Sequence, residues 1–123
     1  MEIKKVKIGK RIYEFVNENW STSRSWGHRT NLFKNGMECL EHKVTYLNRT
    51  WESYEYQTCM FGTIRTLRDL EEKRFIENYK YENDIERFKK GQKDLVIAEF
   101  NKTEIARDLD KLYNAVKLGE FYA

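Results

Sequence analysis

The chain has 123 residues, of which 40% are hydrophobic and 35% are charged, and its formal net charge is +3. This length suits one domain with one modest core, so we expect a single domain over residues 1–123. No apolar run approaches the ~20 residues of a membrane-spanning helix, and the first fifteen residues, MEIKKVKIGKRIYEF, carry charge throughout. These features exclude an integral membrane protein and predict a soluble protein of the cytoplasm.

The basic excess lies in the first part of the chain, where residues 1–50 hold ten Lys or Arg against five Asp or Glu. Dedicated DNA-binding domains usually have a pI above ~9 and clustered basic faces, which is a stronger signal than this one. A small anionic ligand needs only a few arginines, so the balance favours such a ligand over nucleic acid. In an intracellular chain, Cys39 and Cys59 are expected to be buried free thiols rather than a disulfide. They show no CxxC spacing, which gives no support to a zinc site.

Residues 1–50 are typical of four antiparallel strands in a meander. Gly9-Lys10 predicts a short turn between the first two strands, and Asn35-Gly36 predicts a tight hairpin turn, since both of its residues tolerate positive φ. Strand alternation places Tyr13 and Phe15 on one face of the second strand. In the fourth strand it separates Leu40, His42, Val44 and Tyr46 from Glu41, Lys43 and Thr45.

The period changes to a helical one from Trp51, and the first helix is expected to run to about residue 74 with Thr50 as its N-cap. A second helix start is predicted at Asn83 from a capping-box pattern. Residues 94–100 fit either a helix or a strand. A last helix is expected after Thr103, with Gly119 as its stop.

Together these elements predict an α+β fold, with a four-stranded antiparallel sheet in residues 1–50 and two to three amphipathic helices in residues 51–123. Helices of this length on so small a sheet present more apolar surface than one protomer covers. We therefore expect a homodimer or a higher homo-oligomer.

The segment of residues 20–29, WSTSRSWGHR, is predicted to be a loop because Ser and Gly favour turns. Trp20 and Trp26 offer flat rings on which a nucleobase would stack, and Arg24 and Arg29 would neutralise phosphates. A second interpretation stays open, in which the tryptophans plug the open end of the sheet. If the first holds, this loop is a candidate lid over a ligand.

The junction of strand and helix, residues 46–56, is the second candidate site. A helix N-terminus offers unpaired backbone N–H groups and a positive partial charge, which favour an anion. Arg49 adds a guanidinium for phosphate, Trp51 a ring for stacking, and Asn48 an amide that reads polar edges. Alternatively, Trp51 packs in the core and Arg49 pairs with a nearby glutamate.

The chain shows no motif of a catalytic site. It has no elbow serine, no HExxH and no glycine-rich phosphate loop, and neither His28 nor His42 has a second ligand at metal-binding spacing. We therefore expect a protein that is not an enzyme and that holds neither a metal nor a cofactor.

The stretch SWGHRTNLFKNGMECLEHKVTYLNRTWESYEYQT resembles small phage-encoded proteins that follow a four-stranded sheet with an Asn-Arg-Thr-Trp-Glu segment. In this it is similar to the first-described family of Thoeris anti-defence proteins, over roughly residues 10–70. The resemblance implies a homo-oligomeric sponge in the cytoplasm of the infected bacterial host. Such a sponge binds a cyclic ADP-ribose isomer made by TIR-domain immune enzymes and does not cleave it. It also implies an arginine contact from the helical tail, for which Arg107 is our candidate.

Two other functions remain open from the sequence. The exposed aromatic residues would also suit a host-takeover inhibitor, such as an anti-CRISPR, that acts by protein–protein contact. The basic sheet would also suit weak binding of single-stranded nucleic acid, with affinity that falls steeply with salt.

Overall fold

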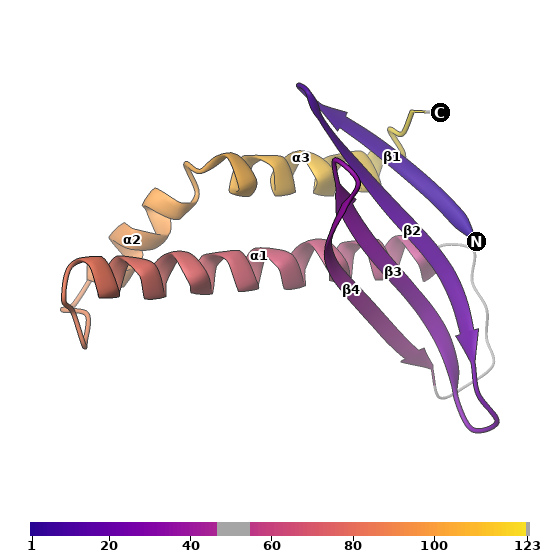
Figure 1. Cartoon of the computed structure of the whole chain (residues 1–123), viewed down its shortest axis with the longest axis horizontal. Coiled ribbons are helices and arrows are strands. Elements are labelled where there is room, and N and C mark those ends of the chain that lie inside the picture. The colour runs from indigo at the N-terminus through magenta and orange to yellow at the C-terminus, as the bar shows by residue number, and fades with distance from the viewer. Residues whose placement is uncertain (47–54, 123) are drawn as a thin grey trace.

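The computed structural model describes residues 1–46 and 55–122, and Figure 1 shows its arrangement. Four strands, β1 (Glu2–Ile8), β2 (Arg11–Ser21), β3 (Trp26–Lys34) and β4 (Met37–Tyr46), form one antiparallel sheet in the order β1-β2-β3-β4. Three helices follow: α1 (Glu55–Glu82), α2 (Gln92–Phe100) and α3 (Glu104–Leu118). The predicted α+β class and the meander are confirmed.

The two predicted hairpin turns, at Gly9-Lys10 and at Asn35-Gly36, form. Asn35 and Gly36 have φ of 50° and 82°, the pair of positive values that a tight hairpin turn requires. Between β3 and β4 the register shifts near Leu32 and Phe33, which leaves Cys39 as the extra residue of a bulge. Both cysteines are free thiols; Cys59 is buried as expected, whereas Cys39 is exposed, because it stands in the bulge of an edge strand.

One face of the sheet, which we call the inner face, is covered by helices, and the other, the outer face, carries none of the described helices (Figure 1). Because side chains alternate along a strand, every second residue faces the helices, and those of β1, β2 and β3 supply the buried core residues of the sheet. The core joins the inner face to α1 and α3. Its members are Val6, Ile8, Tyr13, Phe15, Leu32, Met60, Ile64, Leu67, Leu109, Leu112, Ala115 and Val116.

The helix boundaries differ from the predicted ones in two places. α1 continues to Glu82 rather than ending near residue 74, and no helix starts at Asn83. Asn83 instead donates from Nδ2 to the Tyr79 carbonyl oxygen at 2.8 Å, so it caps the end of α1. Residues 94–100, which fit either element by sequence, belong to α2.

The last helix has both predicted ends. The Thr103 hydroxyl accepts a hydrogen bond from the Ala106 N–H at 3.4 Å, and Gly119 ends the helix with φ of 68°. Beyond it, the chain returns to the sheet, where the Tyr122 N–H donates to the Lys5 carbonyl oxygen of β1 at 3.1 Å. The predicted N-cap Thr50 lies outside the described residues.

Candidate functional site

The segment predicted as a ten-residue loop is mostly strand. Trp20 belongs to β2 and Trp26 to β3, and the two strands pair up to Ser21 and Trp26, so only residues 22–25 form the turn. The Thr22 N–H donates to the Ser25 carbonyl oxygen at 2.7 Å, and the Thr22 hydroxyl accepts from the Ser25 N–H at 3.1 Å. The prediction of a ten-residue loop is therefore wrong, and the role of this segment as a lid stays a prediction.

Trp20 lies on the outer face at the end of the sheet. A Cβ placed on Gly27, opposite Trp20 in the register, would lie 3.0 Å from the indole, so the ring lies against the bare glycine. The indole Nε1–H donates to the His28 carbonyl oxygen at 3.2 Å, and Lys43 Nζ lies 5.4 Å from the ring centroid. The site is therefore a half-buried indole with a cation beside it.

Arg29 shares the outer face with Trp20, but its guanidinium already has a partner. It forms an ion pair with Glu18 of the neighbouring strand. The hydrogen bond that Arg29 donates to Glu18, together with the charges of Glu18 and Glu41, raises the pKa of Arg29. A ligand phosphate would therefore have to compete with a carboxylate for this arginine, whereas Arg24 is exposed in the turn.

Some of the predicted ligand-binding residues do not lie near Trp20 and Arg29 on the outer face. Trp26 is half-buried at the same end of the sheet, but strand alternation places it on the inner face with His28. Arg107 is exposed on α3, and its neighbour Asp108 binds Arg11 at the start of β2. Trp20 lies nine residues beyond Arg11 along β2. At ~3.3 Å per residue, the two are about 30 Å apart, so Arg107 is far from Trp20. Asn48, Arg49 and Trp51 lie outside the described residues.

We name the group formed by Trp20, Arg24, Arg29 and Lys43, with Glu18, the sheet-end cluster. Lys43 was not among the residues singled out from the sequence. The signal for it was present, since alternation puts Lys43 on the same face of β4 as Glu41 and Thr45. What the sequence lacked was the register that sets β4 against Trp20 across β3.

On the inner face at this end lies a group of polar side chains that sequence reasoning missed. His28 Nδ1 lies 2.6 Å from Asn19 Oδ1, within hydrogen-bond distance. The Tyr56 hydroxyl donates to the same oxygen at 2.8 Å, and its ring centroid lies 4.7 Å from that of His28. These contacts bring the first turn of α1 against the end of the sheet.

Deeper in the same group, the Thr30 hydroxyl donates to Asn17 Oδ1 at 2.6 Å, while Asn17 Nδ2 has no partner among the described residues. Burial raises the pKa of the nearby Cys59 thiol, which keeps it protonated at neutral pH and unsuited to act as a nucleophile. Burial, followed by the charge of Arg65, lowers the pKa of His42, which is half-buried.

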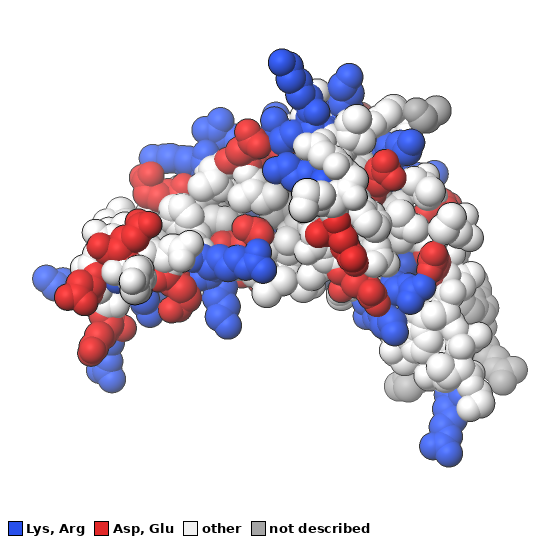
Figure 2. All heavy atoms as spheres, in the orientation of Figure 1, with Lys and Arg blue, Asp and Glu red and all other residues white. Residues whose placement is uncertain are grey.

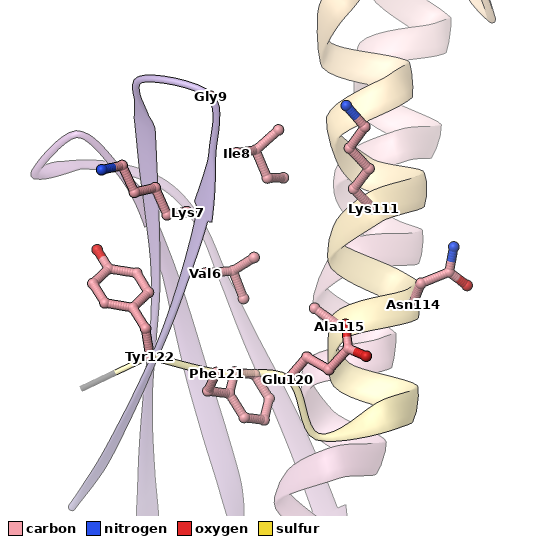
Figure 3. A pocket seen from close by; sticks show the side chains of 10 residues that line it. All are labelled: Val6, Lys7, Ile8, Gly9, Lys111, Asn114, Ala115, Glu120, Phe121 and Tyr122. Carbon is pink, nitrogen blue, oxygen red and sulfur yellow. The ribbon is translucent and has the colours of Figure 1, made fainter.

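The largest described cavity, about 730 Å³, lies between β1, α3 and the C-terminal segment (Figure 3). Val6, Ile8 and Ala115 form its apolar wall, and Phe121 closes one end, whereas the Lys7 side chain points away from it. None of the predicted ligand-binding residues that the structure describes lines this cavity. Its apolar wall residues belong to the core, so the wall already has a structural role.

Charge is intermixed over the face of the molecule that Figure 2 shows, where basic and acidic side chains alternate over helices and sheet. Within residues 1–46 and 55–122, no group of three or more His, Cys, Asp or Glu is placed to hold a metal ion. No helix in this part of the chain is long and apolar enough to cross a membrane.

Comparisons with protein-family models, with curated proteins and with solved structures find no match to this chain. The resemblance to Thoeris anti-defence proteins therefore stays a prediction from the sequence.

Proposed function

We propose that the protein binds an anionic small molecule that carries a nucleobase, and that the sheet-end cluster is where it binds. The observation that carries this proposal is the Trp20 indole, which lies half-buried on the outer face with Lys43 Nζ at 5.4 Å. A base would stack beside this ring, and the ammonium of Lys43 and the exposed guanidinium of Arg24 would meet the phosphates.

The role we assign is sequestration rather than catalysis. The buried Cys59 thiol has a raised pKa, and the His28 imidazole is held by Asn19 and packed on Tyr56. Both groups therefore have structural roles in the core. The family resemblance supplies the finer proposal: a phage-encoded anti-defence protein, oligomeric in the host cytoplasm, that holds a cyclic ADP-ribose isomer.

Calorimetric titration with cyclic ADP-ribose, its isomers and linear ADP-ribose tests this proposal. Stacking on an aromatic ring contributes ~1–3 kcal/mol per base, so Trp20→Ala is expected to weaken binding roughly 5- to 150-fold. Trp20→Phe keeps a ring at the site and is expected to retain most of the affinity.

Phe33→Ala is the matched control, because Phe33 is also a half-buried aromatic residue of the outer face but lies toward the other end of β3. It is expected to leave the affinity unchanged while lowering stability. Equal losses in Trp20→Ala and Phe33→Ala, or no binding of any of these nucleotides by the wild type, would contradict the proposal.

A second candidate function is a protein-binding module that uses the outer face. Ile3 and Ile12 remain 46% and 37% exposed on this face, and exposed apolar side chains of this kind can be covered by a protein partner. This function predicts that no nucleotide raises the melting temperature, whereas a ligand of the folded state must raise it.

A further inference from the structure

The two edges of the sheet are finished differently. The edge at β1 is partly closed, because Tyr122 pairs with Lys5. At the other edge, β4 pairs only with β3 among the described residues. An open edge strand offers a row of unpaired backbone donors and acceptors to a further strand. The question is therefore which strand pairs with the open edge of β4.

The sequence of β4 is complementary to itself in one antiparallel register. When His42 of one copy lies opposite His42 of another, Glu41 faces Lys43 and Leu40 faces Val44 in both directions. The charged pairs then share the outer face, and the apolar pairs share the inner face. The bulge at Cys39 ends regular pairing on one side, so residues 40–46 are the segment available.

Neighbouring registers are worse. A two-fold axis through Glu41 sets Glu41 against Glu41, and an axis through Lys43 sets Lys43 against Lys43. Like charges directly opposite each other destabilise an antiparallel pair. Registers shifted by a single residue would join the outer face of one copy to the inner face of the other, which a two-fold axis perpendicular to the sheet does not allow.

A groove beside the same edge supports a second copy of the chain as the partner of β4. It has a volume of about 320 Å³ and lies between β4 and α1, with His42, Val44, Phe61, Gly62 and Arg65 among its lining residues. His42 and Val44 are only half-buried, although they face the core side of the strand. A second copy paired along β4 would extend over this groove and cover them.

We infer that two copies of this chain pair through β4 in the register centred on His42 and form one continuous eight-stranded sheet. The interface is an extension of the sheet rather than the surplus apolar helix surface expected from the sequence. This inference does not depend on the proposed ligand, and its readout is the mass of the particle.

Charge reversal tests the register by sedimentation velocity over a range of protein concentrations. The wild type is expected to be a dimer, and Lys43→Glu, which sets Glu against Glu twice, is expected to raise the dimer dissociation constant roughly tenfold or more. The double variant Glu41→Lys with Lys43→Glu restores the opposite charges and is expected to restore the dimer. Lys7→Glu, on β1, is the matched control and is expected to leave it unchanged.

Cysteine cross-linking tests the same register without any change of charge on β4. In a Cys39→Ser background, His42→Cys places two thiols opposite each other, where Cα atoms of antiparallel strands lie ~4.5–5.5 Å apart and a disulfide fits. Mild oxidation is expected to link the chains. Thr45→Cys, which faces position 39 of the other copy, is expected to remain unlinked.

A monomeric wild type at all concentrations would overturn the inference. So would a dimer in which Thr45→Cys links as readily as His42→Cys, or in which the double charge reversal fails to recover the association that Lys43→Glu loses. Circular dichroism of each variant shows whether its fold is kept, and the cross-linking result decides if Lys43→Glu does not fold.

Discussion

Asp108 is the charged residue most deeply placed in the described part of the chain, with 1% of its surface exposed. Its carboxylate accepts two hydrogen bonds from the Arg11 guanidinium, at 2.6 and 2.8 Å, and one from the Tyr13 hydroxyl at 2.6 Å. Burial opposes ionisation of Asp108, but these hydrogen bonds outweigh it and hold its pKa below the usual value. The network joins α3 to β2 across 97 positions of sequence.

The lowered pKa of Asp108 predicts how stability depends on pH. The stabilisation from its ionised form is complete above the ~3.9 of an unfolded aspartate and is lost as pH falls through the lower folded pKa. Asp108→Ala, which removes one partner of a buried ion pair, is expected to cost about 3–5 kcal/mol at pH 7. The difference from wild type should shrink below about pH 4, as urea unfolding at pH 7, 5, 4 and 3 would show.

Asp110→Ala is the control for that comparison. Asp110 also pairs with an arginine, Arg68, but its side chain is exposed. Exposed pairs contribute about 0–1 kcal/mol, so this variant is expected to change little at any pH. A stability loss in Asp108→Ala that stays constant down to pH 3 would show that packing, rather than the charge, is what Asp108 provides.

At the residue scale, the sequence predicted which faces side chains take but not which partners they meet. Alternation correctly placed Tyr13 and Phe15 on one face of β2, and the structure shows that this face is the buried one. The pairing of Arg11 with Asp108 was out of reach, because it depends on where α3 crosses β2. The same limit hid Lys43 beside Trp20, since their contact spans β3.

At the element scale, the misjudged loop shows how local propensity is overruled. Ser21 and its neighbours favour turns, yet β2 continues to Ser21, because Trp20 packs over Gly27 and extends the pairing. The glycine that suggested a break in the strand is the residue that lets the indole approach. Two close approaches from the neighbouring strands explain this glycine: the Trp20 ring on one side, and the Val44 carbonyl oxygen, which would lie 1.8 Å from a Cβ at this position.

The capping-box pattern at Asn83 misled for a related reason. α1 has tertiary partners beyond the sheet: the Phe75 ring packs on Phe100 with centroids 5.7 Å apart, and Ile76 is buried. Helix stability in proteins comes mostly from packing of this kind, so α1 continues past the point where the sequence pattern weakens. Asn83 then serves the end of one helix rather than the start of another.

Gly62 lies where α1 crosses β4. Its surroundings predict that Gly62→Ala lowers stability in the wild type but raises it in a His42→Ala background. A Cβ at Gly62 would lie 2.5 Å from His42 Nε2. Overpacking costs ~1–3 kcal/mol, which outweighs the ~1 kcal/mol that alanine gains over glycine in a helix, so Gly62→Ala is expected to destabilise the wild type. In a His42→Ala background the clash is gone, and the same change is expected to stabilise by about 1 kcal/mol.

Chemical denaturation of the four proteins in this double-mutant cycle gives the coupling directly. Thr58→Ala, one turn before Gly62 on the same side of α1, is a suitable control because it adds no atom near His42. Equal effects of Gly62→Ala in the two backgrounds would mean that α1 and β4 are not in close contact here.

At the scale of the whole molecule, the sheet and helices followed from composition and period, but the site did not. The candidate residues were chosen along the chain, and the fold distributes them: Trp20 and Arg29 on the outer face, Trp26 on the inner face, and Arg107 near the opposite end of β2. Register and chain length set these separations. A sequence pattern that ignores them gathers residues that the sheet holds about 30 Å apart.

The same view relates the two proposals. Lys43 lies beside Trp20 in the sheet-end cluster and faces Glu41 of a second copy in the inferred dimer. Pairing through β4 would therefore hold two sheet-end clusters on one continuous outer face. Binding and association remain separable, because Trp20 takes no part in the β4 register.

The most direct test of ligand binding at the sheet end is a nuclear magnetic resonance titration of the ¹⁵N-labelled protein with a cyclic ADP-ribose isomer. The chain has three tryptophans, so its indole N–H signals are few and Trp20→Phe identifies one of them. We expect the Trp20 indole signal and the backbone amides of residues 20–29 to shift as ligand is added. Shifts confined to the β1 and α3 cavity, or no shifts at millimolar ligand, would contradict the account.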